Sequence, residues 1–391
     1  MKSEKRRFKY WVGQLHLWLG LTSGTLVLFL GVTGCMLAFQ REIENLTQPY
    51  RFTATQASPL LPPSVLKQIA DKELPGKHAH SVSYKPGKAS QVVYFSMAPE
   101  YYFTVFINPY TGKVLRTRDN DQDFFRIITM GHYYLWLPPA IGQPIVATGT
   151  LIFVILLITG IVLWWPKNKG ARKQRFSIKW NAKWRRVNYD LHNVLGFYMT
   201  WVIVFICFTG LVWGFQWFAK SAYWVASGGK TLTVFEESFS DTTQIPSIAG
   251  KTQPAMDRLW QRTRAANPGF AGSIDVHVPD SPQAAIEVAL NPDTDTYWQT
   301  DYRYYDQYSL KEIAVKHQYG KYAEARIADK IYRMNYDIHV GAIAGITGKV
   351  IAFIGSLIAS SMPVTGFLIW WGRRKKQRKA KKVQVLDTVY S

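Results

Sequence analysis

Four long apolar runs interrupt a chain that is otherwise mixed in polarity. Each run holds about 20 or more residues with few charges, which is enough for a helix rising about 1.5 Å per residue to cross a hydrocarbon layer about 30 Å thick. A buried helix of a soluble protein is rarely this long or this free of charge. We therefore predict four membrane-spanning helices, over Trp11–Phe39, Pro144–Trp165, Leu195–Phe218 and Val350–Trp371.

Two polar segments lie between the paired apolar runs, and both show the same order of patterns. Each begins with a helix-like stretch and continues with runs of alternating apolar and polar residues bounded by turn residues, which indicate antiparallel strands. The expected fold is a mainly α membrane protein of four spans in two duplicated halves, with two small external α+β domains. The predicted external elements are helices at Pro63–Leu74 and Ala255–Ala266, and strands at His80–Tyr84, Gln91–Met97, Tyr102–Ile107, Val114–Leu115, Ser273–Val278, Ala284–Leu290, Tyr302–Tyr308 and Leu310–Ile313.

Positive charge is concentrated next to the apolar runs. The chain has 47 Lys and Arg against 26 Asp and Glu, a formal net charge of +21. Residues 1–10, 166–188 and 372–391 carry +4, +9 and +7, which together make +20 of this total. Short Lys/Arg-rich flanks stay in the cytoplasm, so we predict that both termini and the central basic loop are cytoplasmic. The charge therefore indicates orientation in a lipid bilayer and argues against nucleic acid as a partner.

These patterns divide the chain into eight predicted segments. They are a cytoplasmic tail and first span (1–40), a first external domain (41–130), an outer histidine segment and second span (131–166), a basic cytoplasmic loop (167–188), a third span (189–218), a second external domain (219–332), an outer histidine segment and fourth span (333–372), and a basic cytoplasmic tail (373–391).

A histidine precedes a Thr-Gly pair in every span. His16 and His192 each lie 18 residues before the glycine of their pair, whereas His132 and His339 lie 28 and 27 residues before theirs. The first and third spans therefore match each other, as do the second and fourth. Because matched spans enter the membrane from the same side, we expect His16 and His192 at one level near the inner face, and His132 and His339 at the outer face.

Ionisable residues inside or at the mouth of a span are costly and usually functional. Two matched histidine pairs at opposite faces suit two haem groups with axial imidazole ligands. The sequence holds no CxxCH motif, which excludes covalent c-type attachment of such haems by the usual motif. We predict that His16 and His192 bind the inner haem iron and that His132 and His339 bind the outer one.

An arginine motif recurs before two of these histidines. Arg186-Val-Asn-Tyr-Asp-Leu-His192 returns as Arg333-Met-Asn-Tyr-Asp-Ile-His339. Arg186 and Arg333 either pair with a haem propionate or mark the membrane interface beside a capped helix, and both can hold. Glycines near the ligands either admit a flat macrocycle or serve helix packing; they are Gly13, Gly20, Gly24, Gly196, Gly341 and Gly345.

Two further signals remain open. Val32-Thr33-Gly34-Cys35 looks like a bacterial lipoprotein cleavage box, but the recurrence of Thr-Gly in every span explains it without processing. His78-Ala-His80 begins a predicted strand with both side chains on one face, so a weak metal site is conceivable beside the alternative of solvated surface histidines.

The chain resembles the PepSY-associated transmembrane family and, within it, the inner-membrane ferric-siderophore reductases. Besides the four histidines, the carriers are the span endings Thr159-Gly-Ile-Val-Leu-Trp-Trp165 and Thr365-Gly-Phe-Leu-Ile-Trp-Trp371, and Phe106-Ile-Asn-Pro-Tyr-Thr-Gly-Lys-Val-Leu115, which looks like the strand-turn-strand of a PepSY domain. The second external segment departs from this pattern, with Tyr305-Asp-Gln-Tyr308 where the turn is expected.

This resemblance implies a di-haem b protein of the bacterial inner membrane, with both external domains in the periplasm. Its substrate would be a ferric siderophore, and its electron donor a quinol or a separate cytoplasmic reductase. The alternative is a non-enzymatic PepSY membrane protein that regulates or binds a periplasmic partner. A variant of it has the histidines bind copper or zinc for transport.

Overall fold

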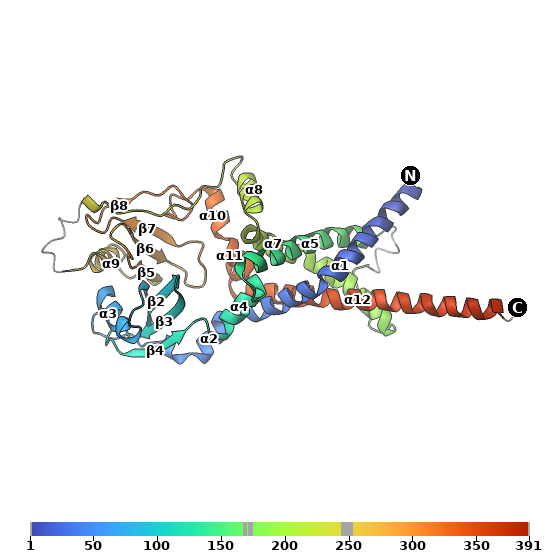
Figure 1. Ribbon diagram of the computed structural model, residues 1–391, viewed down its shortest axis with the longest axis horizontal. Helices are drawn as coiled ribbons and strands as arrows, with labels where there is room; N and C mark the ends of the chain where they lie inside the picture. The colour runs from blue at the N-terminus through green and yellow to red at the C-terminus, as the bar shows by residue number, and fades with distance from the viewer. Residues whose placement is uncertain (1, 167–169, 171–174, 244–252, 390–391) are drawn as a thin grey trace. The chain divides into compact units, whose positions relative to one another are not determined.

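The computed structural model describes residues 2–166, 170, 175–243 and 253–389. The chain forms two compact units (Figure 1). One unit comprises residues 1–39, 128–219 and 338–391, and the other comprises residues 40–127 and 220–337. Of the predicted basic loop at 167–188, residues 167–169 and 171–174 lie outside the described part of the chain.

The first unit is built from four long helices, and each is long and apolar enough to cross a membrane. The four predicted spans are thereby confirmed. Helices α1 and α7 each pack against both α5 and α12, so α1 lies diagonal to α7 and α5 lies diagonal to α12. Their bounds are α1 Lys2–Ala38, α5 Pro139–Trp164, α7 Trp184–Gly214 and α12 Gly345–Val389.

Small residues let these helices approach closely, as is usual in membrane bundles. A Cβ atom added to Gly31 of α1 would lie 2.7 Å from Cβ of Ser360 in α12, and one added to Gly24 would lie 3.2 Å from Cβ of Pro363. A Cβ atom added to Gly214, at the end of α7, would lie 2.6 Å from Cβ of Ala147 in α5. These contacts require glycine because any side chain would separate the helices.

Short helices lead into the second and fourth spans. Helix α4 (Phe124–Tyr134) precedes α5, and α10 (Ile327–Arg333), α11 (Asn335–His339) and the 3-10 turn η3 (Ala342–Ala344) precede α12. Leu135 and Trp136, after α4, both adopt left-handed backbone angles with φ of 56° and 57°. The Trp136 ring folds back over Gly131, where an added Cβ would lie 2.6 Å from the indole, and so holds α4 in place.

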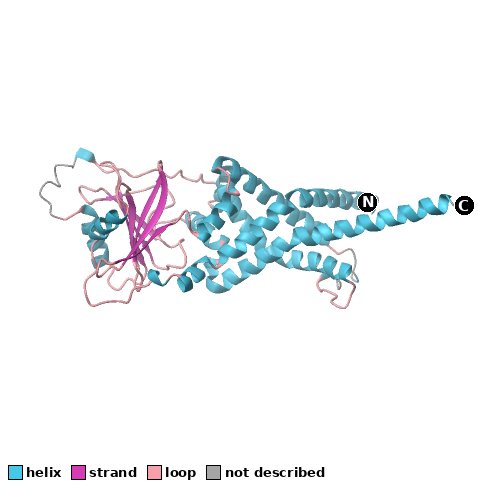
Figure 2. Ribbon diagram, turned by 60° about the horizontal axis from the view of Figure 1, so that its bottom comes forward, coloured by secondary structure: helices cyan, strands magenta, loops and turns pink. Residues whose placement is uncertain are grey.

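The second unit contains one antiparallel sheet of eight strands in the order β4-β3-β2-β1-β5-β6-β7-β8 (Figure 2). Helices α3 (Pro63–Glu73) and α9 (Ala255–Ala266) pack against it and against each other. The strands are β1 Ala79–Tyr84, β2 Ser90–Met97, β3 Glu100–Ile107, β4 Val114–Asp119, β5 Ser273–His277, β6 Ile286–Asn291, β7 Asp301–Tyr305 and β8 Glu312–Ile313. The described elements also include helices α2 (Gln40–Thr47) and α8 (Gln216–Ala226) and the turn η1 (Pro49–Arg51).

The two segments between the paired spans share one sheet and one core, so the expectation of two separate domains at 41–130 and 219–332 is wrong in this respect. Strand β1 of the first segment pairs with β5 of the second, in a register from Ser81↔His277 to Tyr84↔Ile274. Val82 and Val276 face each other at this seam, and both are fully buried in the common hydrophobic core. The physical reason is that each four-stranded half would otherwise expose an unpaired edge strand.

The second turn differs from the PepSY pattern in sequence, but its backbone has the same conformation as the first turn. Asn108 and Asp306 each start a six-residue turn in which the side-chain oxygen accepts bonds from the backbone N–H groups two and three residues on. The fifth position is left-handed in both turns, at Gly112 (φ 74°) and at Leu310 (φ 59°). Leu310 bears a cost of about 1–2 kcal/mol that glycine avoids, and its partly buried side chain packs against the core.

Candidate functional site

Each of the four span histidines contacts the threonine of a Thr-Gly pair in the neighbouring span of the same half. In the first half, Nδ1 of His16 lies 2.8 Å from Oγ1 of Thr159 in α5. Conversely, Nδ1 of His132 in α4 lies 2.8 Å from Oγ1 of Thr33 in α1. The threonine of each span therefore contacts the histidine that lies in, or just before, the other span.

The second half repeats this exchange. Nδ1 of His192 in α7 lies 2.8 Å from Oγ1 of Thr365 in α12, and Nδ1 of His339 in α11 lies 2.9 Å from Oγ1 of Thr209 in α7. The four contacts thus follow one rule in both halves, which fixes the orientation of each imidazole ring.

These contacts also select the tautomer of the imidazoles. Each threonine hydroxyl donates its proton to a carbonyl of its own helix; Thr159, for example, donates to the carbonyl of Ile155 at 2.8 Å. Its oxygen then accepts a hydrogen bond from Nδ1–H of the histidine. The carbonyl of Ile206, 3.1 Å from Nδ1 of His339, can only accept and gives the same assignment. With the proton on Nδ1, the lone pair resides on Nε2, the atom used to bind a metal.

The glycine of each Thr-Gly pair makes room for the histidine ring. A Cβ atom added to Gly366 would lie 3.2 Å from Cε1 of His192, and the corresponding separations at the other three pairs are 3.5–3.7 Å. The other three glycines are Gly160 beside His16, Gly34 beside His132, and Gly210 beside His339. Threonine and glycine therefore act together, one to orient the ring and the other to admit it.

The rings of the outer histidines lie close together, at an edge-to-face angle. The ring centroids of His132 and His339 are 6.2 Å apart. Two imidazole nitrogens bound to one metal ion at about 2.0 Å each would lie about 4 Å apart, with ring centres roughly 6 Å apart. The separation in this structure therefore fits an iron held between the two rings. The indole of Trp213 packs beside His339, with centroids 5.2 Å apart.

The inner histidines also lie close enough to interact electrostatically, His16 with His192. His16 and Thr33 are 17 residues apart in α1, as are His192 and Thr209 in α7. Since Thr33 and Thr209 bind the outer histidines, the two histidine pairs are separated by about 26 Å along these helices. The pairs expected from the sequence are thus brought together at two levels.

Burial keeps the outer imidazoles uncharged. Removal from water lowers the pKa of His132 to about 3, with the neighbouring His339 adding to the effect, and lowers the pKa of His339 to about 4. Only a neutral imidazole can bind a metal ion. Both histidines are therefore in the required state at physiological pH.

The two arginines of the repeated motif have different surroundings. Arg186 pairs with Asp190 one helical turn later, with Nε 2.9 Å from Oδ2. Arg333 does not pair with the equivalent Asp337, whose carboxylate instead accepts bonds from the backbone N–H groups of Tyr297 and Trp298. Arg333 is buried and contacts the backbone carbonyls of Gly320 and Thr300. Contact of either arginine with a propionate stays a prediction.

The glycines noted near the ligands have several roles. A Cβ atom added to Gly13 or Gly20 of α1 would meet a leucine methyl at 3.9 Å, whereas one added to Gly24 would lie closer, against Pro363. Gly341 adopts a left-handed φ of 78° and abuts the carbonyl of Gly348, so backbone geometry requires it. Gly345 has a φ of 60°, and a Cβ atom added to Gly196 would lie 3.4 Å from the sulfur of Met362.

The remaining histidines of interest lie on the sheet. His80 on β1 is exposed and its ring is 4.8 Å from that of His277 on β5. Nε2 of His277 lies 3.5 Å from Oε1 of Glu287 on β6. His78 is exposed and does not join them. Among the described residues, no group of three or more such side chains has the geometry to hold a metal ion.

Sequence reasoning missed the four threonines as site residues. The recurrence of Thr-Gly in each span was the available signal, and it marked the repeat without revealing the contact. The role of each threonine emerges only when the spans are packed side by side, because each contact joins residues 99–173 positions apart.

This geometry defines a membrane protein whose four spans carry two pairs of oriented histidines. The sequence profile of the PepSY-associated TM region matches residues 14–373. The chain therefore belongs to the PepSY-associated transmembrane family. No curated protein matches the chain.

Proposed function

We propose that this protein is a transmembrane di-haem b electron-transfer protein that reduces an Fe(III)-siderophore in the periplasm and releases Fe(II). The observation that carries the proposal is the four-fold histidine–threonine exchange, which leaves Nε2 of each imidazole for a metal, together with the 6.2 Å separation of the His132 and His339 rings. Structural histidines would need neither a common tautomer nor a matched spacing in both halves.

Bound haem would supply one-electron chemistry between Fe(III) and Fe(II). His16 and His192 would hold one haem near the inner face, and His132 and His339 would hold the other near the outer face. The threonine oxygens orient the rings and raise the basicity of the ligating nitrogens. Each Fe(III) reduced takes one electron, which a quinol or a separate cytoplasmic reductase supplies from the inner side.

The proposed orientation in the bacterial inner membrane rests on the basic flanks. Residues 1–10 and 372–391 carry +4 and +7, so both termini would be cytoplasmic and residues 40–127 and 220–337 periplasmic. Lipoprotein processing is incompatible with this function. Cleavage before Cys35 would remove His16, Thr33 and Gly34, and with them one inner ligand and the residues that contact His132.

The proposal is tested by visible spectra of the purified protein in the oxidised and the dithionite-reduced states, together with the haem content per chain. We expect two non-covalent b haems. His16→Ala or His192→Ala should remove one centre, and His132→Ala or His339→Ala the other, while His78→Ala, a change at an exposed histidine, should remove neither. A colourless protein from haem-replete cells would contradict the proposal and favour a non-enzymatic role.

The direction of electron transfer needs a separate measurement. Protein in sealed vesicles is reduced from the cytoplasmic side, and an Fe(III)-siderophore with a coloured Fe(II) chelator is placed on the other side. We expect Fe(II) to form with wild-type protein and not with His339→Ala. Re-oxidation of the haems without formation of Fe(II) would show that the electron acceptor is not the chelate.

A further inference from the structure

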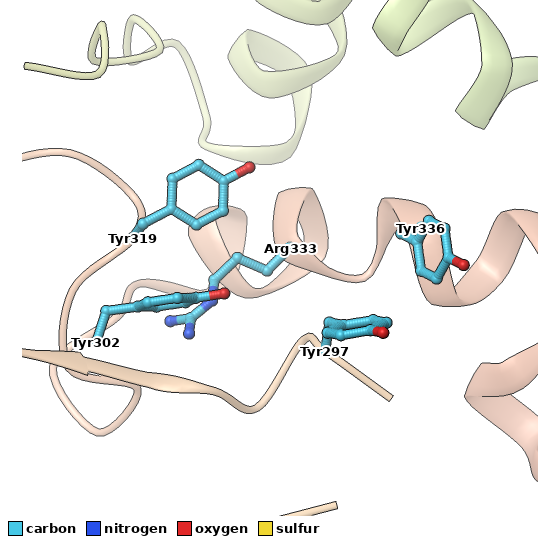
Figure 3. A pocket seen from close by; sticks show the side chains of 5 residues that line it. All are labelled: Tyr297, Tyr302, Tyr319, Arg333 and Tyr336. Carbon is cyan, nitrogen blue, oxygen red and sulfur yellow. The ribbon is translucent and has the colours of Figure 1, made fainter. Parts of the chain in front are cut away.

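A pocket lies in the second unit, and its lining residues include none of the four histidines described above. It has a cavity volume of about 420 Å³ and is lined by four tyrosines and one arginine. This volume is within the range of small-molecule sites. Figure 3 shows the lining side chains, which are Tyr297, Tyr302, Tyr319, Arg333 and Tyr336.

Arg333 supplies a buried positive charge to this pocket. The residue is 6% exposed; its guanidinium donates to the backbone carbonyls of Gly320 and Thr300 and lies over the rings of Tyr302 and Tyr322. Its Nε is buried with no hydrogen-bond partner. In the described part of the chain no carboxylate forms an ion pair with it, since the nearby Asp301 pairs with Arg303 at 2.7 Å. A buried, incompletely bonded cation is costly unless an anion joins it.

The tyrosines give the pocket aromatic walls and neutral hydrogen-bond donors. The guanidinium carbon of Arg333 lies 5.3 Å from the centroid of the Tyr302 ring, and the rings of Tyr297 and Tyr336 meet edge to face at 5.4 Å. Burial raises the pKa of Tyr302 and raises that of Tyr319 to about 12. Both phenols therefore keep their protons, which they can donate to an oxyanion.

We propose that this pocket binds an anionic aromatic group, such as a catecholate, phenolate or aryl carboxylate arm of a small molecule. Arg333 would meet the negative oxygens and the tyrosine rings would flank the arm. That the arm belongs to the iron chelate rests on the function proposed above. Tyr336 lies in helix α11, which ends at His339.

The test uses the full-length protein in lipid nanodiscs and 2,3-dihydroxybenzoate as the probe, with binding followed by saturation-transfer NMR of the ligand. We expect the wild-type protein to bind the probe, to bind uncharged catechol at least about tenfold more weakly, and to give no signal with acetohydroxamate. Equal binding of 2,3-dihydroxybenzoate and catechol would overturn the proposal, because the charge of Arg333 would then be irrelevant.

Variants locate the site. Arg333→Gln should weaken binding at least about tenfold, and Arg333→Lys should retain part of it. Arg264→Gln is the matched control, because Arg264 is an exposed arginine on α9 that stacks on Trp260 outside the pocket. Should Arg333→Gln fold poorly, Tyr297→Leu tests the same site through a side chain that is 48% exposed. Wild-type binding by Arg333→Gln or by Tyr297→Leu would overturn the proposal.

The haem spectrum of each variant shows whether the anion that Arg333 binds is a haem propionate or a separate small molecule. If Arg333→Gln shifts a haem signal and leaves binding of the probe unchanged, the partner of Arg333 is a propionate and the pocket proposal is wrong. If the protein is colourless yet binds the probe through Arg333, the pocket is supported and the electron-transfer function fails. Loss of probe binding with an unchanged haem spectrum supports a soluble ligand.

Discussion

Thr33 and His132 are 99 residues apart in the chain, yet Oγ1 of the threonine lies 2.8 Å from Nδ1 of the imidazole. The threonine belongs to the first span and the histidine to the short helix before the second. His16 and Thr159 make the reverse contact between the same two spans, again at 2.8 Å. The orientation of each histidine is therefore set by a different span from its own.

Removing one threonine hydroxyl should weaken one site only. In Thr209→Val the imidazole of His339 loses the closer of its two acceptors at almost unchanged side-chain volume and keeps only the longer contact with the carbonyl of Ile206. Loss of such an outer-shell partner typically costs about 10- to 100-fold in affinity for the bound metal group. We expect a lower haem content and a shifted midpoint potential at the outer centre, measured by spectroelectrochemistry.

The control for that experiment is Thr200→Val in the same helix. The Thr200 hydroxyl donates to the carbonyl of Gly196 and contacts no histidine, so both centres should remain as in the wild type. An equal loss in Thr200→Val and Thr209→Val would show that the effect comes from helix packing rather than from the histidine contact.

Adding one methyl group at Gly366 should disturb the inner site. The new Cβ would lie 3.2 Å from Cε1 of His192, closer than most carbon contacts allow, so the ring must move. We expect Gly366→Ala to broaden or shift the inner haem signal and leave the outer signal unchanged in low-temperature electron paramagnetic resonance. Gly372→Ala is the control, because an added Cβ there meets no atom within 4 Å.

The turn at Gly112 should respond to the same substitution through two effects. Alanine at a φ of 74° costs about 1 kcal/mol or more in backbone conformation. The new Cβ would also lie 2.8 Å from Cδ1 of Ile69. We expect Gly112→Ala to reduce amide protection in β3 and β4 by hydrogen exchange more than Gly87→Ala does, since Gly87 has a φ of 70° but open space around it. Equal effects of the two changes would mean that the contact with Ile69 is unimportant.

Stability of the second unit should fall as the pH drops below about 6.5. Burial lowers the pKa of His80 and of His277 in the folded state. Their neutral forms therefore stabilise the fold above the unfolded pKa of about 6.5, and this contribution is lost as the pH falls toward the folded values. Burial raises the pKa of Glu287, so its protonation acts in the opposite sense at lower pH.

The pH effect is measured as amide protection of β1 and β5 at pH 7.5 and at pH 6. Replacing His80 and His277 by glutamine should flatten this dependence, whereas replacing the exposed His78 should not. An unchanged pH dependence in the double variant would exclude the imidazoles of His80 and His277 as its source.

The sequence alone predicted the elements well because each has a strong local signal. The apolar runs marked all four spans, and the expected helix at Ala255–Ala266 coincides with α9. The pairing of β1 with β5 could not be predicted in this way, since the two strands are nearly 200 residues apart and their pairing is a property of the folded sheet. The turn at Asp306 was missed because Leu310 occupies the left-handed position in which glycine is the usual signal.

The candidate site was also predicted only in part, because local patterns indicate the depth of a residue along a helix but not its tertiary neighbours. The depth of each histidine followed from helix rise, which grouped His132 with His339, and these two rings lie close together in the structure. The motif shared by Arg186 and Arg333 marked both arginines as candidates, but one arginine pairs with Asp190 and the other is buried among carbonyls and tyrosine rings. Similar local sequences diverge here because their tertiary neighbours differ.

The diagonal arrangement of the spans has a consequence for assembly. Each half of the chain contains one inner and one outer histidine, and each pair draws one member from each half. A chain with only two spans would contain one histidine of each pair and could complete neither pair alone. Two copies related by a two-fold axis would complete both pairs, because an isologous dimer presents the same residue twice across the axis. The present chain supplies both members of each histidine pair from one polypeptide, so a single copy brings together what a two-span chain would need a partner to complete.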